Sequence, residues 1–219
     1  MVVLSIILEW FLPVSTWIFF VSVILQFFFK DNILFVKYIP RFATLIKLFV
    51  GALIINATLF TVGQYYLWDT QSFTEGFLNA PLTGVQVPLF HMIPWIFGSK
   101  LGYFIFYSFS HFWFEPILAG IVASAIYGGM RILKKHKERF FDDDEIRIGT
   151  LIALLVGWPN VIVFIIIAWC MVILYSLVNI VLIKQQYTAF GIPFFIAGIF
   201  TLLWGNKLLI LLNLGVLKV

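Results

Sequence analysis

The chain has 219 residues, of which 63% are hydrophobic and 11% are charged, and its mean hydropathy is +1.07. A soluble domain averages about 45–50% apolar and about 25% charged residues, so this composition excludes a soluble globular protein and requires the bilayer as solvent. The formal net charge is +4. Because Lys and Arg cluster beside apolar runs, as in loops that set membrane topology, nucleic acid is not an expected partner.

The N-terminal part alternates apolar and polar segments. The run Ser5–Phe29 is too long for the core of a signal peptide and predicts a retained span. A basic stretch, Lys30–Lys47, separates it from a second apolar run, Leu48–Trp68. The segment Asp69–Val87 is polar, rich in turn residues and without Lys or Arg. Two spans are therefore expected before a polar connection.

The next two apolar runs are Pro88–Phe114 and Pro116–Leu133. The second carries Gly120, Ser124 and Gly128 at four-residue spacing. Small residues at that spacing let another helix approach closely, so this face is predicted to pack against another helix.

Neither a metal site nor a disulfide is expected. His91 and His111 have no evident third ligand, and the chain has a single cysteine, Cys170, inside an apolar run. No cofactor is expected either.

The charged centre, Lys134–Arg147, reads KKHKERFFDDDEIR. The apolar stretch after it is broken by Trp158-Pro159-Asn160, where proline favours a turn. The piece from Ile148 to Gly157 gives only about 15 Å of helix, half of a core of about 30 Å. To span, this helix must begin near Asp142, which brings acidic residues toward the membrane. A short helix with a sharp turn at its end is predicted.

The last apolar run is Phe190–Leu212. The sequence as a whole predicts an all-α transmembrane bundle of six or seven spans in one membrane domain, residues 1–219. The positive-inside rule places Lys134–Arg139 on the cytosolic side, together with Lys184.

Residues 142–205 carry a recognisable order of motifs. They read DDDEIRIGTLIALLVGWPN, then a long apolar span, then AFGIPFFIAGIFTLLWG. This is similar to the C-terminal half of prepilin leader peptidases, intramembrane aspartic proteases with the pattern G-x-G-D-[VL]-[KR]-L, an apolar helix ending in G-W, an Ala-containing span, I-P-F-G-P-F and a helix ending in Gly. The residues in register are Arg147, Gly157, Trp158, Ala168 and Gly205. The resemblance as a whole covers residues 69–212 and is strongest over 142–205.

The catalytic motif itself differs from the family pattern. Aspartates Asp142 and Asp144 replace both glycines, and Glu145 aligns with the motif aspartate. The family has a second catalytic aspartate at the end of an earlier span, and Asp69 is the upstream candidate, followed here by TQSFTEGFLN in place of I-P-[ND]. The resemblance implies Asp69 and Glu145 as the catalytic pair, with Asp144 as a substitute for Glu145.

The chemistry implied by the resemblance is acid–base catalysis by two carboxyls. Held close together in a low dielectric, they share one proton. The ionised group draws a proton from water, and the neutral group protonates the scissile carbonyl and then the leaving amine. The implied function is an aspartic endopeptidase of a bacterial inner membrane, and its implied partner is the signal helix of a pilin-like precursor. The chain lacks the family's cysteine-rich segment, so methyl transfer is not expected.

Two other functions stay open. The acidic residues 142–145 also suit the N-terminus of a helix, or ion pairs with Lys134–Arg139. In that case the chain is an inactive homologue that serves as a structural subunit of a larger membrane complex. A small transporter or channel is the third candidate.

The charge pattern conflicts with the implied catalytic pair. The positive-inside rule puts both Lys30–Lys47 and Arg131–Arg147 in the cytosol, and one span then puts Asp69 outside. The resemblance needs Asp69 beside Glu145. Either Lys30–Lys47 lies outside or in the interface, or Asp69 is not the catalytic counterpart.

Overall fold

The computed structural model describes residues 2–29, 40–82, 93–136, 141–183 and 190–217. These residues form helices and connections without any strand, which confirms the all-α prediction for this part of the chain. The elements are α1 (Val2–Phe29), α3 (Phe42–Thr70), α4 (Ser72–Leu78), α6 (Pro94–Phe97), α7 (Gly102–Ser108), η1 (Phe109–Trp113), α8 (Phe114–His136), α9 (Asp143–Val156), α10 (Asn160–Val178), η2 (Asn179–Ile183), α11 (Gly191–Leu211) and η3 (Gly215–Leu217).

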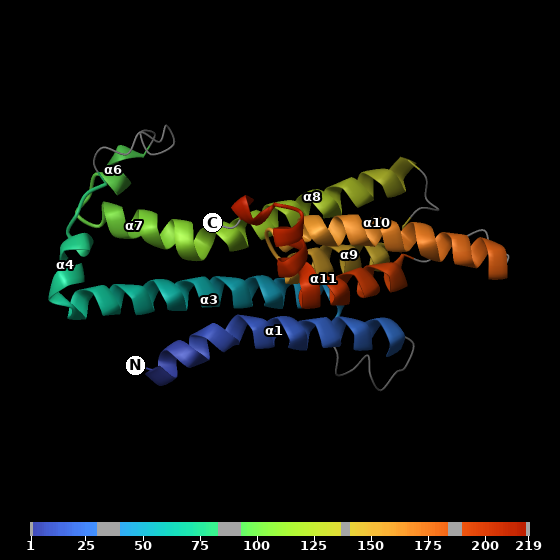
Figure 1. Ribbon diagram of the computed structural model, residues 1–219, viewed down its shortest axis with the longest axis horizontal. Helices are drawn as coiled ribbons and strands as arrows, with labels where there is room; N and C mark the ends of the chain where they lie inside the picture. The colour runs from blue at the N-terminus through green and yellow to red at the C-terminus, as the bar shows by residue number, and fades with distance from the viewer. Residues whose placement is uncertain (1, 30–39, 83–92, 137–140, 184–189, 218–219) are drawn as a thin grey trace.

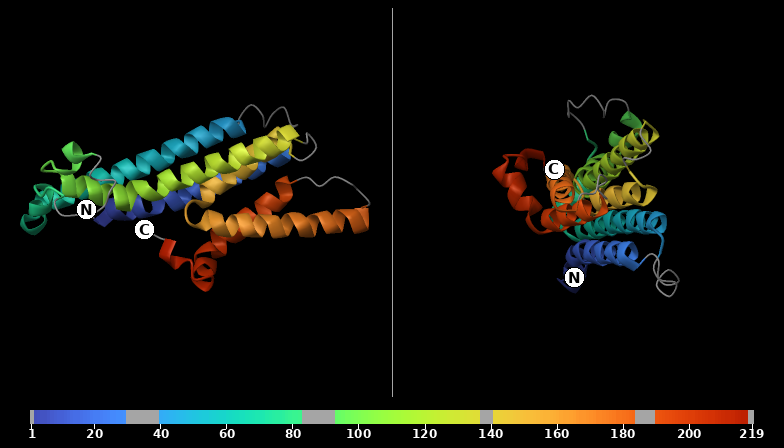
Figure 2. Two further views of the ribbon diagram at one scale, coloured as in Figure 1. Left: turned by 90° about the horizontal axis from the view of Figure 1, so that it is seen from above. Right: turned by 90° about the vertical axis from the view of Figure 1, so that its right-hand side faces the viewer.

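Within the described residues, five helical segments are long and apolar enough to cross a membrane. They are Glu9–Phe29, Phe42–Thr70, Gly102–His136, Asn160–Val181 and Gly191–Leu211. Most of their length runs along the long axis of the molecule (Figures 1 and 2). An integral membrane protein is therefore supported, whereas a count of six or seven spans is not confirmed.

The number of spans differs from the prediction partly because two of the predicted spans belong to a single helix in the structure. Gly102–His136 continues for 35 residues through the π-helical turn Phe109–Trp113. Pro116 follows this turn closely, and proline lacks the N–H that an α-helix needs. A π-helical turn is a known way to insert a local irregularity without ending a helix. The proline therefore does not separate two spans.

The other difference is α9, which is only 14 residues, or about 21 Å, long. It ends at Gly157, whose φ of 71° lies in the left-handed region. The chain turns through Trp158 and Pro159, and α10 starts at Asn160. The predicted short helix with a sharp turn at its end is confirmed.

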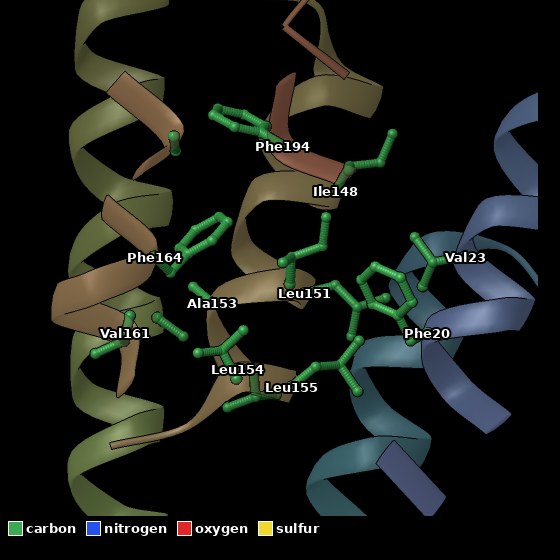
Figure 3. Close-up of a cluster of buried hydrophobic side chains, with 14 of the residues drawn as sticks. Phe20, Val23, Ile148, Leu151, Ala153, Leu154, Leu155, Val161, Phe164 and Phe194 are labelled. Atoms are coloured by element: carbon green, nitrogen blue, oxygen red, sulfur yellow. The ribbon is translucent and has the colours of Figure 1, made fainter. Parts of the chain in front are cut away.

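Helix α9 is the centre of the hydrophobic core. Every residue from Ile148 to Val156 is buried, so the helix is apolar on all sides. Figure 3 shows Phe20 of α1 and Phe164 of α10 on opposite sides of α9. The surrounding helices thus enclose α9 and keep it from lipid.

Glycines allow α11 to lie close to α9. A Cβ added to Gly198 would stand 2.7 Å from Cγ2 of Ile152 and 2.9 Å from the ring of Phe20. A Cβ on Gly149 would stand 2.9 Å from the ring of Phe194. The contacts between α1, α9 and α11 therefore depend on positions that have no side chain.

The predicted packing of the small-residue stripe on α8 is wrong within the described chain. A Cβ at Gly120 or Gly128 would meet nothing within 4 Å. Ser124 is exposed, and its hydroxyl donates to the carbonyl of Gly120 at 2.7 Å. The buried residues of α8 are instead Ala119, Ala123 and Met130. Spacing shows which residues share a face, but α8 has a second small-residue face, and that face turns inward.

Candidate functional site

Helix α9 begins with a capping box made by two of the acidic residues. The Asp142 side chain accepts a hydrogen bond from the N–H of Asp143 at 2.8 Å. In return, Oε2 of Glu145 accepts from the N–H of Asp142 at 3.0 Å. Such reciprocal bonds satisfy backbone donors that the first helical turn leaves free. This is the helix-capping role that the sequence left open.

The second oxygen of Glu145 connects α9 to α11. Its Oε1 accepts from the backbone N–H of Phe190 at 2.6 Å. Phe190 is the N-cap residue of α11 and stands directly before the first residue of that helix. The hydrogen bond therefore joins the acidic segment, residues 142–145, to the FGIPF segment, residues 190–194. These are parts of the chain that carry the resemblance to prepilin peptidases. Both oxygens of this half-buried side chain accept backbone N–H groups.

The neighbouring acids of the same turn pair with basic side chains. Oδ1 of Asp143 lies 2.8 Å from Nζ of Lys134 at the end of α8. This hydrogen bond and the lysine charge lower the pKa of the Asp143 carboxyl. Asp144 stands 3.8 Å from the guanidinium of Arg147, and these side chains are 38% and 43% exposed. The ion pairs that the sequence left open are thus present for these two acids.

Asp69 lies far from this turn. It is the next-to-last residue of α3, after Trp68, which packs with Leu78 and Phe104 in a second hydrophobic cluster. Near its other end, α3 contributes Phe42, Leu45 and Phe49 to the main core around α9. The two clusters lie at different ends of α3 (Figure 1).

Position along the helices indicates the separation of Asp69 and Glu145. Leu154 shares a small cavity with residues of α3 as far as Ala57. From that level α3 runs on toward its C-terminal end, where Asp69 lies. Glu145 lies in the opposite direction, at the N-terminal end of α9 (Figures 1 and 2). At 1.5 Å per residue the two residues are about 30 Å apart, whereas a shared water requires about 6 Å. The structure does not bring this pair together.

The fold also bears on the topology conflict. The end of α1, the start of α3, the end of α8 and the start of α9 all lie at one end of the bundle (Figures 1 and 2). The helices that flank both basic stretches therefore meet there, and Asp69 is at the opposite end. Of the two explanations, the one that fits is that Asp69 is not the counterpart of Glu145. Lys184 is outside the described residues, but α10 ends and α11 begins at this same end.

The remaining described acids are also remote from Glu145. Glu115 stands at the start of α8, about 30 Å along the helix from its end at His136. Glu9 is 18 positions, or about 27 Å, before Phe27, the α1 residue whose ring meets Gly191 at the start of α11. Within the residues that the structure places, no other helix brings a carboxylate to this turn.

Comparison with protein-family models, with curated proteins and with solved structures found no match to this chain. The resemblance to prepilin peptidases consequently rests on the motifs of residues 142–205 themselves.

Sequence analysis missed a group of amides that the fold brings together. Asn56 of α3, Asn160 of α10 and Asn206 of α11 all line one cavity beside Glu115. An available signal was that Asn56 and Asn206 each interrupt an apolar span, where polar side chains are rare and usually have a role, and that Asn160 starts another. Spacing along the chain does not show that they meet.

Proposed function

We propose that this chain is a non-catalytic, prepilin-peptidase-like membrane protein that serves as a structural subunit of a larger membrane complex. The observation that carries this proposal is the bonding of Glu145. Its two oxygens accept the backbone N–H groups of Asp142 and Phe190, at 3.0 and 2.6 Å. Catalysis by two carboxyls requires both acids to touch one water or one carbonyl. At the position of the motif aspartate, this chain instead has a residue that joins two helices.

The proposal also explains why the resemblance persists while the motif changes. The acidic segment and the FGIPF segment meet through Glu145 and Phe190, so the motif positions serve helix packing. On this proposal the protein lies in a bacterial inner membrane with the loop 134–139 in the cytosol, as the positive-inside rule favours.

The open stripe of α8 is the proposed contact with a partner subunit. A Cβ at Gly120 or Gly128 would meet nothing within 4 Å, and Ser124, Ile117 and Ile121 are exposed. At Gly120 the stripe borders a small cavity whose other wall is α3. In lipid, helices associate through small residues that let backbones approach closely. A transmembrane helix of another subunit fits this face.

A working peptidase is the second candidate, because the two segments that resemble the family do meet at Glu145. The discriminating experiment reconstitutes the purified chain in liposomes with a pilin-like precursor. The variants are Glu145→Gln, Glu145→Asp, which restores the motif aspartate, and the matched control Asp144→Asn. We expect no cleavage by any of them. Cleavage that Glu145→Gln abolishes and Asp144→Asn retains would establish the peptidase and remove the non-catalytic proposal.

The subunit role has its own test in native membranes. Gly128→Leu places a bulky side chain on the stripe, whereas Gly51→Leu does so at a site on α3 where a Cβ would also meet nothing within 4 Å. Gentle solubilisation and native electrophoresis measure the size of the assembly. We expect the wild type and Gly51→Leu in a large complex and Gly128→Leu in a smaller one. The same large size for all three would contradict the stripe as the contact.

A further inference from the structure

A partly open cavity of about 660 Å³ lies beside the C-terminal end of α9. Its walls come from α1, α3, η1, α8 and α11, from the end of α9 and from the turn between α9 and α10. Asn56, which lines it, is the fifteenth of the 29 residues of α3, so the cavity lies near the middle of a spanning helix. The cavity adjoins the point where α9 stops at Val156 and the chain turns back.

The cavity contains a buried hydrogen-bond acceptor that has no donor. Oδ1 of Asn56 has no hydrogen-bond partner among the described residues, although this residue is only 9% exposed. Leaving such a group unpaired in an apolar medium is unfavourable. Asn160, whose Nδ2 donates to Oδ1 of Asn206 at 3.4 Å, also has an unpartnered Oδ1 at the cavity wall. Both oxygens are acceptors, so a ligand that donates hydrogen bonds would satisfy them.

The electrostatic character of the lining favours a positive charge. Glu115 contributes a carboxylate, and the described lining residues include neither Lys nor Arg. The C-terminal end of α9, from Leu154 to Gly157, also forms part of the wall. The last carbonyls of a helix carry partial negative charge, equivalent in total to about half an electron. The lining thus combines one carboxylate with the end of a helix, and His111 is its one basic side chain among the described residues.

The size and the aromatic lining favour an organic cation over a metal ion. Small-molecule sites typically measure about 300–1,000 Å³, which includes this volume. Trp17, Phe60, Phe112 and Trp158 contribute aromatic rings, and such rings attract cations held over their faces. A metal ion requires several ligands close together, and the described residues contain no group of three His, Cys, Asp or Glu that could hold one.

We propose that this cavity binds a small organic ammonium ion whose N–H groups donate to Oδ1 of Asn56 and whose charge lies beside Glu115. The inference is independent of whether the chain cleaves a precursor or joins a complex, because it concerns the opposite end of α9 from Glu145.

The test uses benzylammonium chloride with the full chain purified in detergent. Benzyl alcohol is the neutral compound of the same shape, and benzoate is the anion. Thermal unfolding is followed at increasing concentrations of each compound, since a ligand that binds only the folded state raises Tm. We expect benzylammonium alone to raise Tm in a saturable way. An equal rise with benzyl alcohol, or no rise with benzylammonium, would overturn the proposal.

Two variants locate the binding. Glu115→Gln and Asn56→Leu are each expected to weaken the apparent affinity for benzylammonium at least tenfold. Leucine resembles asparagine in size and removes the unpartnered amide, so Asn56→Leu is expected to fold. Glu75→Gln, which changes a carboxylate of α4 that does not line the cavity, is the control and should bind as the wild type does. Unchanged affinity in both cavity variants would place the binding elsewhere and refute the assignment.

Discussion

Oε1 of Glu145 accepts a hydrogen bond of 2.6 Å from the backbone N–H of Phe190. The bond spans 45 positions of sequence and fixes the start of α11 against the start of α9. Because the other oxygen caps α9 through Asp142, one side chain determines the local geometry at the ends of two helices. This arrangement gives Glu145 a measurable structural role, whether or not a partner is bound.

Removing the carboxylate of Glu145 should destabilise the protein. Glu145→Ala loses two charge-assisted hydrogen bonds, each contributing about 1.5–3 kcal/mol, so we expect the free energy of unfolding to fall by about 3–6 kcal/mol. Glu145→Gln keeps one acceptor oxygen and should lose about half of that amount. Equilibrium unfolding in mixed detergent measures both values.

Asp144→Asn is the matched control for that experiment. Asp144 is exposed and stands 3.8 Å from Arg147, a surface pair that contributes about 0–1 kcal/mol. We expect its unfolding curve to overlay that of the wild type. A loss as large as that of Glu145→Ala would show that charge in this turn, rather than the two hydrogen bonds, stabilises the fold.

Gly157 should tolerate no side chain, because of its backbone conformation. Its φ is 71° and its ψ is 175°, a region that is essentially restricted to glycine. We expect Gly157→Ala to lower the free energy of unfolding by about 1–3 kcal/mol. The control is Gly120→Ala on α8, where a Cβ likewise meets nothing within 4 Å but the backbone is helical. That change should be neutral or stabilising, since alanine favours helices. Equal effects on Tm would contradict the strain at Gly157.

Gly198 tests the close packing of α11 on α9 and α1. An added Cβ would stand 2.7 Å from Cγ2 of Ile152, so a neighbour must shift. Overpacking of this kind costs about 1–3 kcal/mol, and we expect Gly198→Ala to lower Tm accordingly. Gly128→Ala, at an open position of α8, serves as the control. A wild-type Tm for Gly198→Ala would mean that the helices lie farther apart than the structure shows.

The ion pair between Lys134 and Asp143 predicts a pH dependence. Lys134 lowers the pKa of the Asp143 carboxyl in the folded state. The contribution of the pair is therefore fully present above the unfolded-state pKa of about 4, and it is lost as the pH falls through the lower, folded-state pKa. Carbon-detected NMR of the Asp143 carboxyl should give a pKa below that of an ordinary aspartate. Lys134→Met should return it toward the ordinary value, and an unchanged pKa in this variant would rule out the lysine as the cause.

Local signals in the sequence predicted some of the structure well. The limits of α9 follow from DDDE at its start and from Gly157-Trp158-Pro159 at its end, because caps and breakers act over a few neighbouring residues. The number of spans could not be predicted from such local signals. Pro116 is a strong helix breaker in isolation, but the π-helical turn before it lets the helix continue.

The small-residue stripe illustrates the limit of periodicity. The spacing of Gly120, Ser124 and Gly128 places them on one face, yet α8 turns Ala119 and Ala123 inward. Both faces are apolar enough for lipid or for protein. Which of the two faces is buried depends on the shapes of the neighbouring helices. These shapes cannot be predicted from the sequence of α8 alone.

Hydropathy and capping are local properties, so they predict from the sequence that this chain is helical, that it lies in a membrane, and where α9 begins and ends. The partners of the carboxylates, in contrast, follow only from the fold. It placed Asp69 and Glu145 at opposite ends of the bundle and gave Glu145 the N–H of Phe190. The physical reason is that such contacts depend on which helix ends meet. That outcome results from the packing of the whole bundle around α9, not from the spacing of residues along the chain.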